Sequence, residues 1–291
     1  MHLHDNLQRF VFEDTPIRGE IVRLDSTYRA VLDRRDYPPA VREVLGELMV
    51  AVALLASTLK FEGKLTMQIQ GSGPVKLLMA ECTQRGTMRA LAQWHGDIER
   101  APLGHMIGAG RFAITIDPDD SHERYQGVVD LEGGSVARAL EHYFAQSEQL
   151  ETRLWLAADR EQAAGMLLQK LPDTQLEDVD AWDRAVHLGS TLTRLELLSL
   201  PVPDILRRLY HEEDIRLFAR QPMSFRCSCS RERVEAVLRM LGQDEVESIL
   251  NERGNVDVNC EFCGAHYEFD VVDAAQLFAA SAPSDAPSRT Q

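Results

Sequence analysis

Four of the five cysteines in this 291-residue chain form two close pairs near its C-terminal end. Cys227 and Cys229 lie in "RCSCSRER", and Cys260 and Cys263 lie in "NCEFCGAHYEFD". In an extended segment, side chains two residues apart project to the same side, so the first pair can aim both sulfurs at one point. The second pair suits a tight turn, because Gly264 follows it and tolerates positive φ. Four converging thiolates form a closed structural zinc site, so the spacing predicts one zinc ion held by the four reduced cysteines.

Other interpretations of these cysteines remain. Spacing alone leaves an iron–sulfur centre open. Burial as small apolar residues is disfavoured, because both pairs are flanked by polar residues or glycine. Cys82, in "MAECTQRG", has no cysteine near it in the sequence, and we expect a structural or incidental thiol there. His266 could compete as a ligand, but four thiolates already fill a tetrahedral shell.

The same four sulfurs could also serve redox chemistry. Zinc binds thiolates, and thiolates are the species that oxidants attack. A disulfide within either pair would remove zinc ligands. The pattern therefore indicates a metal clamp that oxidation can open.

The cysteines belong to a predicted small domain over residues 222–273. Ser230 is suited to cap a helix that ends at Gly242, and a second helix over 244–250 and strands at 256–259 and 266–272 follow. The apolar face of the first helix is expected to consist of Val234, Val237, Leu238 and Leu241. About 50 residues build only a small core, so the domain should depend on its metal. The tail, residues 274–291, is small, polar and contains proline, which predicts disorder.

Residues 1–176 are expected to form an α+β domain. Apolar positions at helical spacing predict a long, mostly buried helix within 38–61, and Asp25 is suited to cap a shorter one over 26–34. Strands are expected at 9–13, 18–24, 64–70, 75–81, 87–94, 111–117, 125–131, 152–158 and 163–169, with a helix over 135–147. Successive strands with few helices between them favour a largely antiparallel sheet.

A charged helical connector is predicted over residues 177–221. Residues 177–220 contain nine acidic and six basic side chains, and two helical stretches, 180–200 and 204–220, are separated by "PVP". Isolated helices of this length are marginal, so they depend on packing against a neighbour. The connector is therefore a segment that could loosen.

The formal net charge of −15 disfavours nucleic acid or an anionic membrane as the main partner. No signal peptide or apolar run of membrane-spanning length is evident, which favours a cytoplasmic protein. The sequence contains no phosphate loop, zinc-protease helix or nucleophile elbow, so we do not expect an enzyme. Two alternatives stay open, a zinc-ribbon binding module and a dithiol oxidoreductase that uses Cys260 and Cys263. Residues 227–273 carry a net charge of −7, from four basic and eleven acidic side chains, which opposes phosphate binding.

The segments "RCSCSRERVEAVLRMLGQDEVESIL" and "GNVDVNCEFCGAHYEFD", with the acidic connector before them, resemble the 33 kDa chaperonin family, the redox-regulated heat-shock chaperones of bacteria. The opening "RFVFEDTPIRGEIVRL" and the chain length fit as well. This resemblance implies an ATP-independent holdase for unfolded client proteins that is inactive while zinc is bound. It implies that oxidation joins Cys227 to Cys229 and Cys260 to Cys263 and releases zinc. The zinc domain then unfolds, and the active form implied by the resemblance is a dimer.

Overall fold

The computed structural model describes residues 5–58, 62–119, 124–131, 134–172 and 178–279. Its contacts divide the chain into two units, Met1–Arg226 and Cys227–Gln291. Among the described residues, no helix combines the length and the apolar character that crossing a membrane requires.

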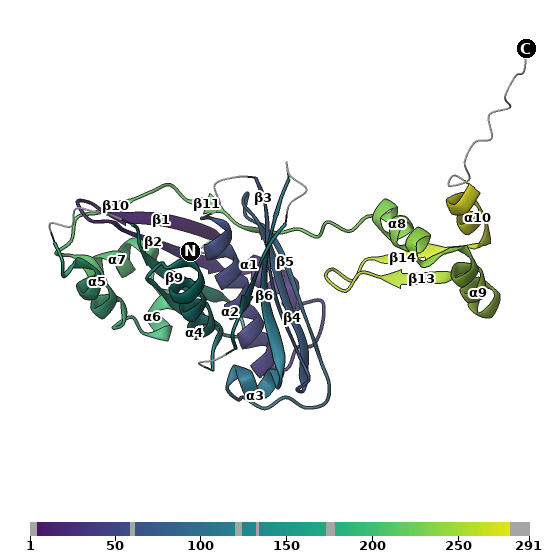
Figure 1. Cartoon of the computed structure of the whole chain (residues 1–291), viewed down its shortest axis with the longest axis horizontal. Coiled ribbons are helices and arrows are strands. Elements are labelled where there is room, and N and C mark those ends of the chain that lie inside the picture. Colours follow the sequence, from purple (N-terminus) through teal and green to yellow (C-terminus); the bar gives the residue numbers. More distant parts are fainter. Residues whose placement is uncertain (1–4, 59–61, 120–123, 132–133, 173–177, 280–291) are drawn as a thin grey trace, which may run out of the picture. The chain divides into compact units, whose positions relative to one another are not determined.

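The first unit contains two six-stranded sheets (Figure 1). The first sheet has the order β10-β1-β2-β9-β8, with β11 also paired to β1, and the second has the order β12-β5-β4-β3-β6-β7. Strands of the first sheet are β1 (Asn6–Phe12), β2 (Ile17–Leu24), β8 (Thr152–Ala158), β9 (Ala163–Lys170), β10 (Ile215–Leu217) and β11 (Gln221–Pro222). Those of the second are β3 (Gly63–Gly71), β4 (Val75–Thr83), β5 (Thr87–Trp94), β6 (Gly110–Pro118), β7 (Tyr125–Val129) and β12 (Ser224–Phe225). All described pairings are antiparallel except β12 with β5, which confirms the predicted α+β class and largely antiparallel sheets.

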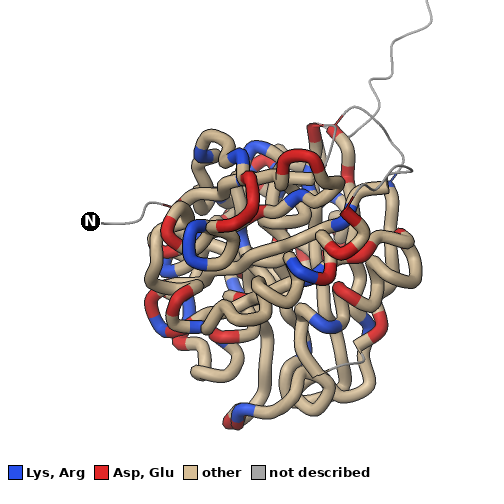
Figure 2. The backbone as a smooth tube through the Cα atoms, turned by 90° about the vertical axis from the view of Figure 1, so that its left-hand side faces the viewer, with Lys and Arg blue, Asp and Glu red and all other residues tan. Residues whose placement is uncertain are grey.

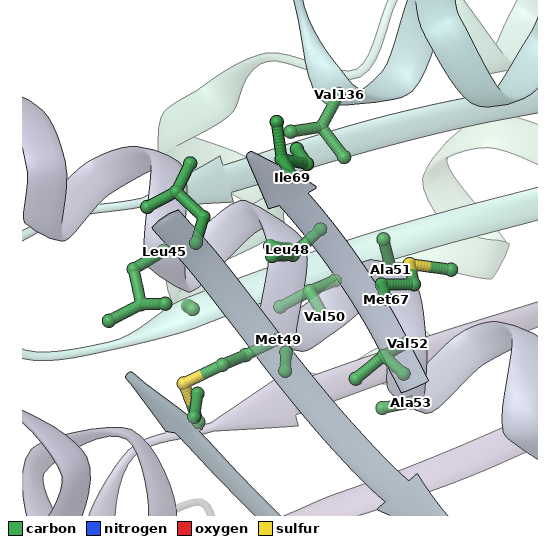
Figure 3. Close-up of a cluster of buried hydrophobic side chains, with 14 of the residues drawn as sticks. Leu45, Leu48, Met49, Val50, Ala51, Val52, Ala53, Met67, Ile69 and Val136 are labelled. Carbon is green, nitrogen blue, oxygen red and sulfur yellow. The ribbon is translucent and has the colours of Figure 1, made fainter. Parts of the chain in front are cut away.

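The long helix α2 (Pro39–Ala56) contacts strands of both sheets and is buried along most of its length, as its apolar spacing predicts. Figure 3 shows Leu48, Val50 and Val52 of this helix and Met67 and Ile69 of β3, which all belong to the same buried hydrophobic cluster. The helix approaches β9 closely, because a Cβ at Gly165 would lie 2.3 Å from Cγ1 of Val50. The other helices before residue 150 are α1 (Ser26–Leu32), which Asp25 caps as expected, α3 (Leu103–Ile107), α4 (Val136–Tyr143) and the π-helical turn η1 (Phe144–Glu148).

The expected connector forms three helices, α5 (Ala181–Gly189), α6 (Arg194–Ser199) and α7 (Val202–Tyr210), rather than two. The capping box of Thr193 and Glu196 starts a new helix within the first predicted stretch. The second predicted stretch is wrong after Tyr210, because residues 215–217 pair with the free edge of β1 as strand β10. Figure 2 shows acidic and basic residues interspersed over the side of the unit that faces the viewer.

Helices α5 to α7 pack against the first sheet on the face opposite α2. Successive strand residues point to opposite faces, and on β2 Ile21 joins the cluster formed with α5 to α7, whereas Val22 joins the core around α2. Tyr210 lies edge-on to Phe12, with ring centroids 4.9 Å apart. Among the described residues this second core has 19 buried side chains, from both the sheet and the helices. The connector helices therefore cover a substantial apolar surface of the sheet.

The second unit is built from α8 (Arg231–Leu241), α9 (Gln243–Arg253), the hairpin β13 (Val256–Asn259) and β14 (His266–Phe269), and α10 (Val271–Ala279). Ser230 caps α8, and Gly242 ends it at φ 98°, as predicted. The expected apolar face of α8 is partly wrong, because Leu238 is buried while Val237 and Leu241 are exposed. Among the described residues the core of this unit is small, with seven buried residues, Leu238, Val246, Leu250, Val256, Phe269, Ala274 and Leu277.

Both expected boundaries of this domain move. The sequence predicts a start at residue 222, but β11 and β12 add residues 221–225 to the sheets of the first unit. The sequence predicts an end at residue 273 and a disordered tail over 274–291, but α10 continues to Ala279 and buries Ala274 and Leu277. The remainder of the predicted tail, 280–291, lies outside the described residues.

Candidate metal centre

The two cysteine pairs are positioned by the ends of regular elements. Cys227 and Cys229 directly precede α8, whose N-cap Ser230 accepts a hydrogen bond from the Arg233 amide at 3.3 Å. Cys260 and Cys263 lie in the turn between β13 and β14. The Cys260 amide donates to the Ala265 carbonyl at 2.9 Å, and the Gly264 amide donates to the Cys260 carbonyl at 2.7 Å.

Gly264 adopts φ 72°, which confirms the positive φ expected after the second pair. A side chain would strain this left-handed backbone. The hydrogen bonds and the glycine together fold residues 260–265 into a knuckle that presents both of its sulfurs to the same point.

The four predicted sulfurs converge. All four lie within 4.8 Å of one another, with 3.7 Å between the sulfurs of Cys227 and Cys260 and 3.3 Å between those of Cys229 and Cys263. Four thiolates bound to one metal at about 2.3 Å would stand about 3.8 Å apart at the corners of a tetrahedron. The cluster therefore has the donor set and the spacing of a four-thiolate metal site.

These short contacts join one cysteine of the first pair to one of the second. They do not single out the disulfide partners, Cys227 with Cys229 and Cys260 with Cys263, that the family resemblance implies. That pairing stays a prediction.

The sulfurs are electrostatically unequal. Burial raises the pKa of Cys229, but hydrogen bonds outweigh this effect, first of all that from Tyr267, and lower the pKa to about 7. Burial raises the pKa of Cys263 to about 12. Four thiolates this close would repel one another, and a divalent cation would neutralise part of their charge.

Cys82 lies elsewhere, in β4. Its side chain is 1% exposed, and burial raises its pKa to about 12. A buried thiol of high pKa has little reactive thiolate. The position agrees with the expectation of a structural thiol that takes no part in the cluster.

His266 is exposed and lies outside the sulfur cluster, as expected. Its Nδ1 is 3.0 Å from Oδ1 of Asn259, and its Nε2 is 3.2 Å from Oδ1 of Asp257. With Glu268 these residues form a separate exposed group of potential ligands. The histidine contacts polar neighbours on the hairpin, and the four cysteines form a group of potential ligands without it.

Two contacts around the cluster were not predicted from the sequence. The hydroxyl of Tyr267 donates to the sulfur of Cys229 at 3.2 Å. The guanidinium of Arg231 lies 4.2 Å above the centre of the Phe269 ring and forms an ion pair of 2.8 Å with Asp273. An aromatic residue in a strand predicts only packing, so no local signal points to either contact. Together they tie the start of α8 to the hairpin and to α10.

Comparisons with known proteins agree with this architecture. A family model described as "Hsp33 protein" matches residues 5–270. The chain is 50% identical over 280 residues to a "33 kDa chaperonin" of Methylobacillus flagellatus, with 96% of each chain covered. It is 50% identical over 278 residues to a protein of the same name from Nitrosococcus oceani, again with 96% of each covered.

A crystal structure of a 33 kDa chaperonin from Thermotoga maritima has the same fold, with a TM-score of 0.81 at 23% identity, covering 96% of this chain and 99% of that one. The family model spans both units described above, from β1 to the end of the hairpin that carries the second cysteine pair. The chain therefore belongs to the Hsp33 family of 33 kDa chaperonins.

Proposed function

We propose that this protein is a redox-regulated, ATP-independent chaperone that binds unfolded client proteins during oxidative stress. In the reduced state, Cys227, Cys229, Cys260 and Cys263 hold one zinc ion and the protein is inactive. The convergence of four sulfurs in a unit with a seven-residue core is the observation that carries this proposal. Family membership supports the chaperone role.

The size of the second unit explains why its sulfurs could act as a switch. When bound, zinc would supply four metal–sulfur bonds that join the first cysteine segment to the hairpin. Structural zinc sites contribute about 10 to 16 kcal/mol, whereas whole domains are stable by about 5 to 15 kcal/mol. The small core therefore cannot keep the unit folded by itself, and losing the four-sulfur crosslink should unfold it.

Oxidation would remove the ligands. With hydrogen peroxide, one thiolate attacks a peroxide oxygen, the O–O bond breaks, hydroxide leaves, and a sulfenic acid forms. A second thiolate then attacks that sulfur, forms the S–S bond and expels a second hydroxide. In forming each disulfide, the two thiolates give two electrons to one peroxide. The two hydroxides that result take up two protons and become two waters. We propose that the two bonds join Cys227 to Cys229 and Cys260 to Cys263.

The connector would relay this change. The chain runs from β10 through β11 and β12 directly to Cys227. If α5 to α7 loosen, the apolar residues that they cover on the first sheet, such as Phe12, Ile21 and Met166, become exposed. Exposed apolar surface of this kind binds unfolded chains and promotes self-association. We accordingly propose a homodimer as the active, oxidised form.

The test compares suppression of aggregation of a chemically denatured client by two preparations of the full chain. Reduced, zinc-loaded protein should leave aggregation unchanged, and protein treated with peroxide at elevated temperature should suppress it. The double variant Cys260→Ser/Cys263→Ser should lose this regulation, whereas the matched control Cys82→Ala should retain it. Equal suppression by both preparations of the wild type, or none by either, contradicts the proposal.

A dithiol oxidoreductase that uses Cys260 and Cys263 is the second candidate, because the two sulfurs lie in one turn. An insulin reduction assay separates the two functions. Catalytic turnover with a thiol reductant would support the oxidoreductase, and no turnover would support the chaperone.

A further inference from the structure

We propose that Tyr267 is a positioning residue for the redox switch, whose hydroxyl holds the Cys229 sulfur by a hydrogen bond and slows its attack on oxidants. This inference rests on the proposed function, because it concerns how fast the same thiolates react. The observation behind it is the distance of 3.2 Å between the Tyr267 hydroxyl and the Cys229 sulfur.

The two residues are 38 positions apart, and different elements hold them in place. Tyr267 lies on β14 opposite Val258 of β13, and its ring packs against the small core of the second unit. Cys229 lies just before the N-cap of α8. The hydrogen bond therefore joins the hairpin to the first cysteine segment. The geometry of this hydrogen bond depends on the folded second unit and is lost when the hairpin unfolds.

The direction of the effect follows from the chemistry of sulfur. A phenol is a hydrogen-bond donor, and donation to a thiolate draws electron density away from the sulfur. At a cysteine that binds no metal, a hydrogen-bond donor can instead speed the reactions of the sulfur, because it increases the fraction present as thiolate. In a zinc site that benefit disappears, because all four ligands are already thiolates. Only the loss of nucleophilicity remains, so the hydroxyl should protect Cys229.

The step affected is the attack of the Cys229 thiolate on peroxide, in which an S–O bond forms, the O–O bond breaks and hydroxide leaves. The logarithm of thiolate nucleophilicity changes by about 0.4 to 0.5 for each tenfold change in sulfur basicity. If the donor lowers that basicity by about one to two powers of ten, losing it should speed attack by about 3- to 10-fold. Removal of groups that support metal ligands typically lowers metal affinity by about 10- to 100-fold. Tyr267 should thus set both the retention of the metal and the oxidant threshold.

The test uses the full-length Tyr267→Phe variant, which keeps the ring and removes only the hydroxyl. Tyr125→Phe is the control, because it removes a phenol from the first unit. The rate of zinc release is followed with a colorimetric indicator over a series of peroxide concentrations, and zinc affinity is measured by competition with a chelator. Tyr267→Phe should release zinc about 3- to 10-fold faster than wild type, and Tyr125→Phe should match wild type.

Cobalt substitution supplies a readout that a merely structural role would not change. The d–d bands should keep the intensity of a tetrahedral four-thiolate site, which shows that the variant is folded. The sulfur-to-cobalt charge-transfer band should move to lower energy, because a sulfur without its donor gives up an electron more easily. Unchanged release rate and an unchanged charge-transfer band would overturn the proposal.

If Tyr267→Phe fails to hold metal, a second substitution at the same position still tests the proposal. Site-specific 3-fluorotyrosine at position 267 keeps the shape of the side chain and donates more strongly, so zinc release should become slower than in wild type. Release at the wild-type rate, or faster, overturns the proposal. If wild-type protein binds no metal at four thiolates, the proposed function itself fails, and this result is distinct from either outcome for Tyr267.

Discussion

Arg23 of β2 offers the sharpest test of how the connector is held. Its side chain is 5% exposed, and its two terminal nitrogens donate to the carbonyls of Leu197 and Leu198 at 2.6 and 3.0 Å. These carbonyls belong to the last turn of α6 (Arg194–Ser199), where helix carbonyls lack partners within the helix and a positive charge is favourable. Arg23 therefore fastens a connector helix to the first sheet.

The expected cost of Arg23→Met can be worked from these contacts. Hydrogen bonds to charged groups are worth about 1.5 to 3 kcal/mol each, and two would give about 3 to 6 kcal/mol. Part of this is offset, because the variant no longer buries a guanidinium, whose burial lowers the pKa of Arg23 to about 10. We expect the docking of α6 to weaken by about 2 to 4 kcal/mol, which makes local opening at least about 30-fold more frequent.

Hydrogen exchange read by mass spectrometry measures this opening. Peptides over residues 194–200 should exchange at least about 30-fold faster in Arg23→Met, while peptides from β3 and β4 keep the wild-type rate. The control is Arg29→Met. The Arg29 side chain is half exposed, and its ion pair with Asp25 spans 3.9 Å. Unchanged exchange at 194–200, or equal acceleration in β3 and β4, would refute the role of Arg23 as a local fastening. Under the proposed function, Arg23→Met should also suppress aggregation at a lower oxidant concentration.

Three further predictions concern stability. Gly165→Ala should lower the free energy of unfolding by about 1 to 3 kcal/mol in urea, because its Cβ would meet Val50; an unchanged urea midpoint would contradict the close packing of α2 on β9. Burial raises the pKa of Glu20 to about 7, so the folded state holds a proton more tightly than the unfolded state, and stability should fall by about 3 kcal/mol as the pH rises from 4.5 to 7. Glu20→Gln should lose this part of the pH dependence in urea unfolding, and an identical slope in both proteins would contradict the assignment. Removing metal from reduced protein with a chelator should unfold residues 227–279 and leave the first unit folded; persistent slow hydrogen exchange in α8 and α9 would show that the small core suffices.

Much of the first unit follows from local sequence pattern. The strands from β1 to β9 and the buried helix α2 are confirmed, since alternation and helical spacing report which face of each element is covered. The cysteine cluster is also accessible from sequence, because each pair is close in the chain and only two segments must meet. Local pattern does not predict the strand at 215–217, because these residues become a strand only by pairing with the edge of β1.

The sequence by itself determined the two close cysteine pairs, the cap and end of α8, and the glycine that turns the knuckle, because each depends on residues close together in the chain. Only the tertiary structure decided that residues 221–225 belong to the sheets of the first unit, that Arg23 holds the end of α6, and that Tyr267 reaches Cys229. These contacts join residues 38 or more positions apart. Their partners are set by how whole elements pack, which local spacing does not encode.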